Sequence, residues 1–387
     1  MSGVPLALYV HVPWCVRKCP YCDFNSHGVG RGASLPEAAY LDALISDLEA
    51  DLGHADGREL ISIFIGGGTP SLMSGDFYRR LLTAVASRLP FADDIEITLE
   101  ANPGTLERGR FAAYRSAGIN RLSLGVQSFH SEQLAALGRI HSGDDALAAF
   151  REAREAGFDN VNLDLMHGLP GQTPELALAD LDRALELAPE HLSWYQLTLE
   201  PNTEFHTHPP SLPAEETLWD IQDLGHERLQ AAGFERYEIS AYARPRRRAR
   251  HNLNYWSFGD YLGIGAGAHG KLSRPGERGL TIERRWKTRQ PDAYLRRTND
   301  PRGFVAGARG VDEEALVLEF AMNALRLVDG VPMSVWEAHT GRPLSQLGDR
   351  LAEAREKGLV VQDGTRLQAS PQGLLFLNDL LVLLDDA

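Results

Sequence analysis

Short apolar runs rich in β-branched residues alternate with longer stretches of helical periodicity over the first 240 residues. The longer stretches, such as SGDFYRRLLTAVASRLP (74–90) and DDALAAFREAREAGF (144–158), often end at glycine, as at Gly118, Gly157 and Gly233, which is typical of helix C-termini. The alternation predicts a parallel sheet built from strand–helix–strand units. The predicted strands are LALYVHV (6–12), ISIFIGGG (61–68), DIEITLEANP (94–103), RLSLGVQS (121–128), NVNLDLMHGLP (160–170), HLSWYQLTLEP (191–201) and ERYEIS (235–240).

These strands are apolar on both faces, as a parallel sheet covered by helices requires. Six or seven such units suit a complete or partial (β/α) barrel better than a small open sheet, and a doubly wound sheet is the alternative. We therefore predict an α/β fold with a partial (β/α) barrel.

Polar residues gather where the predicted strands end. The cysteines follow the first strand and GGGTP (66–70) follows the second, while Glu100 ends the third, Gln127 ends the fourth and the fifth carries Asp164. Each of these alone fits a plainer role, such as a helix cap or a tight turn. Because the chemistry of α/β barrels lies at the carboxyl ends of the strands, their shared position predicts one functional rim.

The character of the chain changes near residue 240. RPRRRARHNLNYW (244–256) is basic and then aromatic, YLGIGAGAHG (261–270) follows, and the residues up to about 290 are rich in Gly, Pro and Arg, which indicates a linker. We expect a core barrel over 1–245, a connecting segment over 246–289 and a small domain over 290–387.

The last part of the chain reads as mainly helical. GLVVQDGTRLQAS (358–370) indicates a hairpin around Asp363-Gly364. Several helices and a hairpin predict a domain similar to a winged helix. The predicted helices lie in EEALVLEFAMNALRL (313–327), SVWEAHT (334–340), SQLGDRLAEAREKG (345–358) and GLLFLNDLLVLL (373–384).

Charge excludes one broad class of function. The chain has a formal net charge of −14, and residues 290–387 carry 15 acidic against 10 basic residues. Nucleic-acid binding depends on Lys and Arg neutralising phosphates, so we expect no nucleic-acid partner. The opening MSGVPLALYVHVPWC lacks the features of a signal peptide, and no run approaches the ~20 apolar residues of a membrane helix. A cytoplasmic location is therefore expected.

All three cysteines fall within eight positions, as Cys15, Cys19 and Cys22. This C-x3-C-x2-C spacing can surround one metal site. A structural zinc ion needs four ligands, and His11, His27 or Asp23 is available as the fourth. A [4Fe-4S] cluster normally takes one cysteine per iron, so three cysteines leave one iron open to a non-protein ligand. The spacing favours such a cluster and leaves zinc as the alternative.

C-x3-C-x2-C after the first strand, with Tyr21 before the third cysteine, resembles the radical S-adenosylmethionine (SAM) superfamily. The resemblance implies a [4Fe-4S] cluster whose open iron chelates the methionine moiety of SAM, and reductive cleavage of SAM to a 5′-deoxyadenosyl radical. The cofactors supply that chemistry and the protein positions them.

The segments YVHVPWC, FIGGGTPSL, LEANPGT, RLSLGVQSF, NLDLMHGLPGQT and YLGIGAGAHG resemble the oxygen-independent coproporphyrinogen oxidase group, which includes a branch of heme chaperones. The resemblance covers residues 6 to about 270 and extends to the C-terminal domain. It implies that SAM is bound by Tyr9, Tyr21, Gly67, Gly68, Thr69, Glu100, Gln127, Arg139 and Asp164. Glycines suit this role because the backbone must approach the ligand closely, and Arg139 suits a carboxylate.

Two features separate the chaperones from the enzymes in this group. The enzymes of this group have a fourth cysteine, in the pattern C-x3-C-x2-C-x-C, and this chain has Phe24 at that position. HNLNYW (251–256) matches the H-N-x-x-Y-W pattern of the chaperone branch. There the resemblance implicates His251 in heme binding, and neutral imidazole is a good iron ligand. Tyr255 and Trp256 are candidates to stack on the porphyrin.

The five arginines of residues 244–250 have three readings: partners of heme propionates, contacts with anionic lipid at the inner face of the membrane, or a solvated surface. The glycines of 265–270 fit G-x-G-x-x-G, but no helix start follows, and Leu272 stands where a P-loop needs Ser or Thr. We interpret this run as a turn that closes the barrel.

Three functions remain after this reading. The first is a chaperone that binds heme, a [4Fe-4S] cluster and SAM and delivers heme to respiratory proteins, with a homodimer as a further implication of the resemblance. The second is oxygen-independent oxidative decarboxylation of coproporphyrinogen III. The third is a radical SAM methyltransferase. Phe24 and HNLNYW favour the first.

Overall fold

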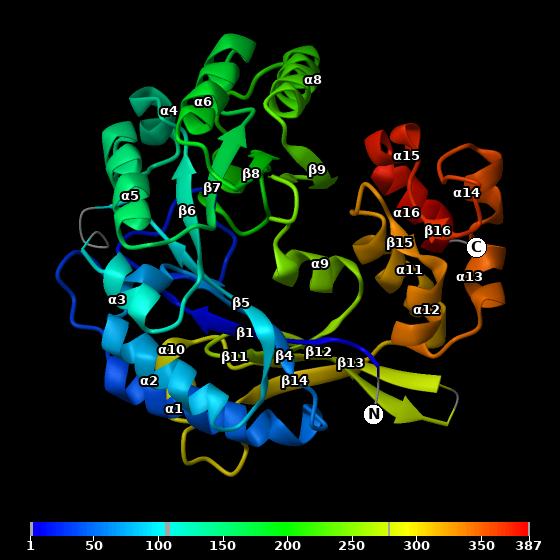
Figure 1. Ribbon diagram of the computed structural model, residues 1–387, viewed down its shortest axis with the longest axis horizontal. Helices are drawn as coiled ribbons and strands as arrows, with labels where there is room; N and C mark the ends of the chain where they lie inside the picture. Colours follow the sequence, from blue (N-terminus) through cyan, green and yellow to red (C-terminus); the bar gives the residue numbers. More distant parts are fainter. Residues whose placement is uncertain (1–2, 105–108, 278, 386–387) are drawn as a thin grey trace.

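The computed structural model describes residues 3–104, 109–277 and 279–385, so Thr105 of the LEANPGT segment lies outside it. One twelve-stranded sheet forms the body of the molecule, in the order β14-β13-β12-β11-β1-β4-β5-β6-β7-β8-β10-β9 (Figure 1). The six central strands are β1 (Leu6–Val12), β4 (Leu60–Gly67), β5 (Phe91–Ala101), β6 (Arg121–Gln127), β7 (Val161–His167) and β8 (His191–Gln196).

The central strands pair in parallel and in chain order, without the reversal of winding that defines a doubly wound sheet. The helices between them cover one face of the curved sheet (Figure 1). A partial barrel is therefore confirmed, and its carboxyl ends meet at one rim. The covering helices are α1 (Glu37–Asp51), α2 (Gly75–Ala86), α3 (Phe111–Ser116), α4 (Ser131–Ala136), α5 (Gly143–Glu155), α6 (Pro174–Glu186), α7 (Glu204–Thr207) and α8 (Glu215–Ala231), with 3-10 turns at Leu52–His54 and Pro70–Leu72.

Helix ends follow the local sequence closely. The Ser74 side chain accepts the Phe77 amide at the start of α2, and Ser142 forms a capping box with Asp145 at the start of α5. Gly118, Gly157 and Gly233 all have positive φ angles, between 81° and 107°, as expected of glycines that end helices.

The expected linker before residue 290 is wrong, because this segment belongs to the sheet. Strand β11 (Asp260–Ile264) pairs in parallel with β1, and β12 (His269–Gly276), β13 (Gly279–Lys287) and β14 (Val305–Gly310) extend the sheet in antiparallel fashion. The strands in this segment were not predicted because the segment is rich in basic residues. In the structure several of these charges pair with acidic side chains elsewhere in the chain. Lys287, for example, lies 2.5 Å from Asp47 and 2.6 Å from Asp51.

The sheet extends to Gly310, past the domain boundary expected at residue 290. The division of the chain into domains at residues 245 and 289 stays a prediction. At the other edge β10 (Ala241–Ala243) and β9 (Glu235–Glu238) pair in antiparallel fashion. Helix α9 (Arg250–Trp256) leads from that edge back across the sheet to β11, and α10 (Pro291–Leu295) lies against α1 (Figure 1).

The C-terminal domain is helical, as predicted, and its apolar cluster around Phe320 and Trp336 continues into the main sheet through Tyr237, Phe258 and Ile282. The expected hairpin at Asp363-Gly364 is reduced to one bridge between Val360 and Ala369, because β16 (Arg366–Leu367) pairs with β15 (Val331–Pro332) instead. The helices are α11 (Glu313–Ala324), α12 (Met333–Thr340), α13 (Leu344–Arg350), α14 (Ala352–Glu356), α15 (Pro371–Leu375) and α16 (Leu377–Asp385).

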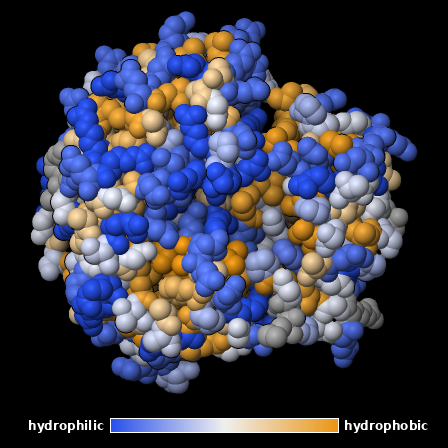
Figure 2. Space-filling model, in the orientation of Figure 1, coloured by the Kyte–Doolittle hydropathy of each residue, from blue (hydrophilic) through white to orange (hydrophobic). Residues whose placement is uncertain are grey.

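The surface is hollowed between the barrel and the C-terminal domain, and hydrophobic residues are exposed there, whereas much of the barrel face is hydrophilic (Figure 2). Among the described residues, no helix is both long enough and apolar enough to cross a membrane.

Candidate cofactor site

The three cysteines lie in the loop after β1, at the barrel rim. Trp14–Cys15 (β2) pairs with His27–Gly28 (β3), and the Cys22 amide donates to the Cys19 carbonyl at 3.1 Å, so the loop folds back on itself. All three thiols line a cavity of about 290 Å³, which we call the cluster cavity. In the described part of the chain, no three Cys, His, Asp or Glu side chains converge on one metal ion. Three thiols around one cavity can supply one thiolate to each of three irons of a cluster.

The glycines that follow β4 are required by close contacts. A Cβ atom at Gly68 would lie 2.7 Å from the Trp14 carbonyl oxygen, and one at Gly67, where φ is 111°, would lie 2.6 Å from the His11 ring. The amides of Gly68 and Thr69 donate to the carbonyls of Val12 and Trp14 at 2.7 Å. These bonds tie the segment to the start of the cysteine loop, so that Gly67, Gly68 and Thr69 line the cluster cavity.

Two partly buried carboxyls line the cluster cavity. Glu100 Oε2 accepts the Gly67 amide at 3.1 Å, and Asp164 accepts Ser123 Oγ at 2.9 Å and Asn162 Nδ2 at 2.8 Å. Burial, and then the neighbouring Asp164, raises the pKa of Glu100 to about 8, and burial also raises the pKa of Asp164. Paired acids of this kind favour a cationic ligand, whose charge would offset the cost of ionising them.

A guanidinium and an aromatic wall close the other side. Arg139 Nη2 donates to Asn102 Oδ1 and to the Gly125 carbonyl at 2.7 Å, and Nη1 lies 3.7 Å from Cys19 Sγ. Gln127, at a φ of 68°, accepts the Tyr195 hydroxyl at 2.8 Å. Arg139 is therefore fixed beside the cysteine loop, with a charge suited to a carboxylate.

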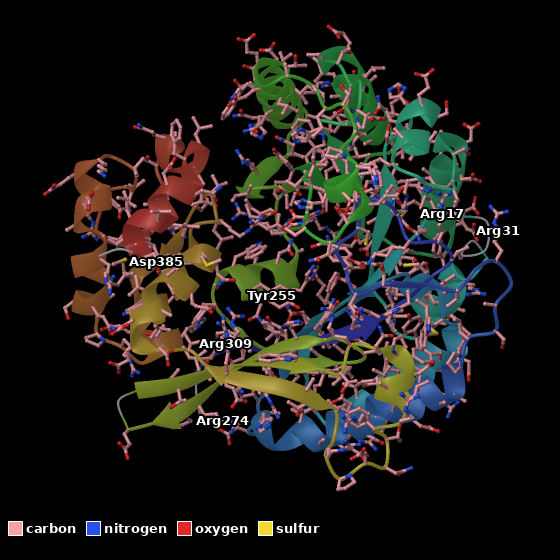
Figure 3. All side chains as sticks on the ribbon, turned by 180° about the vertical axis from the view of Figure 1, so that it is seen from behind. Arg17, Arg31, Tyr255, Arg274, Arg309 and Asp385 are labelled. Carbon is pink, nitrogen blue, oxygen red and sulfur yellow. The ribbon has the colours of Figure 1, made fainter. Side chains whose placement is uncertain are left out.

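A second cavity of about 360 Å³, which we call the aromatic cavity, adjoins the first. It shares Phe24, Gly67 and Glu100 with the cluster cavity. In Figure 3, Tyr255 of α9 lies in the middle of the molecule, between the barrel and the C-terminal domain. Arg17 and Arg31 lie at the edge of the barrel that is away from that domain. The aromatic side chains that line the cavity are Tyr9, Phe24, Phe64, Tyr255, Trp256, Phe258 and Tyr261.

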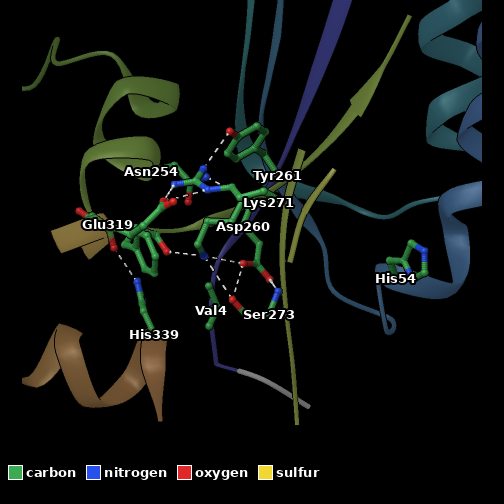
Figure 4. A network of polar contacts seen from close by, with 12 residues as sticks. Val4, His54, Asn254, Asp260, Tyr261, Lys271, Ser273, Glu319 and His339 are labelled. Carbon is green, nitrogen blue, oxygen red and sulfur yellow. Dashed lines mark hydrogen bonds and ion pairs between the residues drawn. The ribbon is translucent and has the colours of Figure 1, made fainter. Parts of the chain in front are cut away.

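A buried ionic network supports the floor of the aromatic cavity (Figure 4). Lys271 Nζ donates to Asp260 Oδ1 and the Phe258 carbonyl at 2.9 Å and to Ser273 Oγ at 3.2 Å, which uses all its donors. Arg284, the second cation of the lining, donates to Glu319 and to the Tyr261 hydroxyl but keeps further N–H groups.

His251 lies behind the aromatic cavity instead of facing it. The residue is 6% exposed, its Nδ1–H donates to Glu96 at 3.0 Å, and its ring stacks on Phe64 with 4.2 Å between centroids. Burial lowers the pKa of His251, against the opposing effect of the Glu96 hydrogen bond. Burial alone would raise the pKa of Glu96, but the His251 hydrogen bond and the Arg121 charge outweigh it and lower this pKa to about 2.

No arginine of the run lines the aromatic cavity, and the reading of these residues as partners of heme propionates stays a prediction. Arg248 pairs with Asp329 and Glu235, Arg250 with Asp94, and Arg247 with Asp159. Arg244 donates to the Ala232 carbonyl. Most of the run therefore neutralises nearby carboxylates. The glycine run that follows it ends β11, with positive φ at Gly265 and Gly267, and leads into β12.

Eleven of the thirteen predicted site residues line the cluster cavity, and Tyr9 and His251 do not. Tyr9 lines the aromatic cavity, where its hydroxyl donates to His11 Nδ1 at 2.7 Å. Sequence reasoning missed Asn102 and Tyr195 in the cluster cavity. In the aromatic cavity it missed Lys271 and Arg284, because it read their strands as a linker, and it also missed Phe258, Tyr261 and His269.

Comparison with known families agrees with this geometry. The model of the radical SAM superfamily matches residues 9–184, and that of the HemN C-terminal domain matches residues 311–376. Heme chaperone HemW of Escherichia coli (strain K12) is 49% identical, over 98% of this chain and 98% of that protein. Heme chaperone HemW of Haemophilus influenzae is 48% identical, over 98% and 97%.

Two further relatives widen the comparison. Radical S-adenosyl methionine domain-containing protein 1, mitochondrial, of Bos taurus is 37% identical, over 98% of this chain and 87% of that protein. The solved structure of coproporphyrinogen III oxidase (HemN) from Escherichia coli superposes with a TM-score of 0.80 at 24% identity, over 99% and 90% of the two chains. At that identity the likeness shows the fold alone.

Proposed function

Because the chain belongs to the radical SAM superfamily and, within it, to the HemW family of heme chaperones, we propose that it binds heme and passes it to heme-accepting respiratory proteins. The aromatic cavity beside the cysteine loop is the observation that carries this proposal. Its volume is within the range of small-molecule sites, and its flat side chains suit the faces of a porphyrin.

The superfamily implies a [4Fe-4S] cluster and SAM, and the residues of the cluster cavity fit both. Cys15, Cys19 and Cys22 would hold three irons of the cluster. When bound, the cluster supplies an electron for reductive cleavage of SAM.

The remaining lining suits the methionine end of SAM. The ammonium of SAM would find the carboxyls of Glu100 and Asp164 in this lining, and its carboxylate would find the guanidinium of Arg139, while Gly67, Gly68 and Thr69 line the same cavity. Tyr21 and Gln127 complete this lining, and Tyr9 lies in the adjoining aromatic cavity, which shares Gly67 and Glu100 with the cluster cavity.

The pKa of Glu100 predicts how SAM affinity depends on pH. With a pKa of about 8, Glu100 is protonated at pH 7 in the absence of ligand, so a cationic ligand must displace a proton in order to bind. Affinity should therefore rise between pH 6 and pH 8, by up to about tenfold per unit, and then level off. Anaerobic calorimetry of SAM on the cluster-loaded protein measures this. Glu100→Gln should weaken binding about tenfold and flatten the profile, and a wild-type profile already flat would contradict the assignment.

His251 should affect heme affinity through the cavity wall. Because its ring supports Phe64 and is held by Glu96, His251→Ala should weaken hemin binding severalfold by loosening the aromatic lining. The measurement is a hemin titration against the exposed-site control His208→Ala, and equal affinities in the two variants would remove His251 from the heme site.

Coproporphyrinogen oxidation is the alternative, favoured by the fold it shares with HemN. Anaerobic incubation of the reconstituted protein with SAM, a reductant and coproporphyrinogen III should give no decarboxylated product under the carrier proposal. Turnover that Cys19→Ala abolishes would instead establish the enzyme.

The setting of the function is also a proposal. We place the protein in the cytoplasm, and a surface contact with the inner face of the membrane would bring it to its recipients. A homodimer is a further element of this proposal.

A further inference from the structure

One histidine in the lining of the aromatic cavity lacks a structural task. His269 begins β12, where it pairs with Trp286 of β13, and its side chain is exposed. Two residues further along the same strand, Lys271 lines the cavity floor, so the two side chains lie on the same face of the sheet. No hydrogen bond to either His269 ring nitrogen occurs among the described residues; the only ring contact is with Trp286, 6.5 Å away.

The two other histidines near this cavity are occupied. His11 accepts the Tyr9 hydroxyl on Nδ1 and donates from Nε2 to the Asn25 carbonyl at 2.9 Å, while His251 is bonded to Glu96 and covered by Phe64. Neither lines the aromatic cavity. Within the described lining, His269 is the only His, Cys or Met, which are the side chains that most often bind heme iron.

Resting on the proposed function, we infer that His269 supplies the protein ligand to the iron of bound heme, with the macrocycle against the aromatic side chains of the cavity. A neutral imidazole binds iron through a free lone pair. Partial burial, and then the charges of Arg289 and Arg284, lowers the pKa of His269, which favours the neutral ring. Arg284 has N–H donors left for a propionate at the same edge.

This inference gives the two histidines different tasks. His269 sets the coordination of the iron, whereas His251 shapes the wall through Phe64. Replacing His269 should therefore change the spectrum of bound heme, and replacing His251 should change affinity and leave the spectrum as in the wild type.

The test uses the full-length, cluster-reconstituted protein and hemin, followed by Soret difference spectra and by electron paramagnetic resonance of the ferric heme. His269→Ala should lose the histidine-ligated signature and bind hemin about tenfold more weakly or worse. Added imidazole should restore the wild-type spectrum by entering the space left by the side chain. His208→Ala, an exposed histidine on another part of the surface, is the matched control.

The outcomes separate this inference from the proposal beneath it. A wild-type protein that fails to bind hemin saturably overturns the proposed function. If the wild-type protein binds hemin and the spectrum of His269→Ala is unchanged, only the ligand assignment is overturned. Loss of the histidine-ligated spectrum in His251→Ala would identify His251 as the iron ligand instead. Equal iron and sulfide contents in all variants exclude misfolding as the cause.

Discussion

Cys19→Ala should be unable to hold a [4Fe-4S] cluster after anaerobic reconstitution, whereas the wild type should take up about four irons and four sulfides per chain. The chain has only three cysteines, and all of them line one cavity. Removing one leaves two sulfur ligands for four irons, and the described lining offers no histidine in its place. The expected effect is therefore complete loss of the cluster.

Phe24→Ala is the matched control for this variant. It alters the same loop at a side chain that is 58% exposed and cannot bind iron, so it should retain the cluster. Iron and acid-labile sulfide analysis with the visible spectrum decides the outcome. Full cluster content in Cys19→Ala, or zinc without sulfide in the wild type, would be incompatible with the radical SAM account.

Asp260→Ala should be the most destabilising single substitution in the sheet. Asp260 is fully buried and accepts hydrogen bonds from Lys271, Arg58 and Ser273, at 2.7 to 2.9 Å. Its removal leaves Lys271 buried without a counter-ion, which typically costs about 3–5 kcal/mol. Because the network joins β11 and β12 to the segment before β4, we expect a clear drop in the midpoints of thermal and urea unfolding.

The charge state of Asp260 sets the conditions for this measurement. Burial alone would raise its pKa, but Lys271 and Arg58 outweigh burial and lower it. Its stabilising contribution is therefore present above the unfolded-state pKa and is lost as the pH falls through the lowered folded value. Measurements at pH 7 should show the full effect. Asp76→Ala, in an exposed pair with Arg79, should change stability by less than about 1 kcal/mol, and equal midpoints for the two variants would refute the network's role.

The rim could be predicted from sequence because each of its residues follows a strand. Glu100, Gln127 and Asp164 end up in one cavity since the parallel strands keep their chain order across the sheet. Gly67 and Gly68 were predictable for a similar reason, as backbone that passes close to its neighbours cannot carry a Cβ atom.

The aromatic cavity was harder to foresee because its walls come from segments far apart in the chain. Tyr9, Phe64, Tyr261 and His269 lie on four different strands, and only the pairing of β11 and β12 beside β1 brings them together. Lys271 looked like a linker residue because nothing in its local sequence points to Asp260. The HNLNYW pattern drew attention to His251, although its burial against Glu96 is visible only in three dimensions.

The central claim is that this radical SAM scaffold carries heme, and a hemin titration of the cluster-reconstituted protein tests it most directly. Followed by the Soret band, the titration should saturate near one heme per chain, at a site whose occupation protects Tyr255 and Trp256 from solvent and quenches tryptophan fluorescence. Absence of saturable binding, together with turnover of coproporphyrinogen III by the same preparation, would contradict the carrier account and make the protein an enzyme of the same fold.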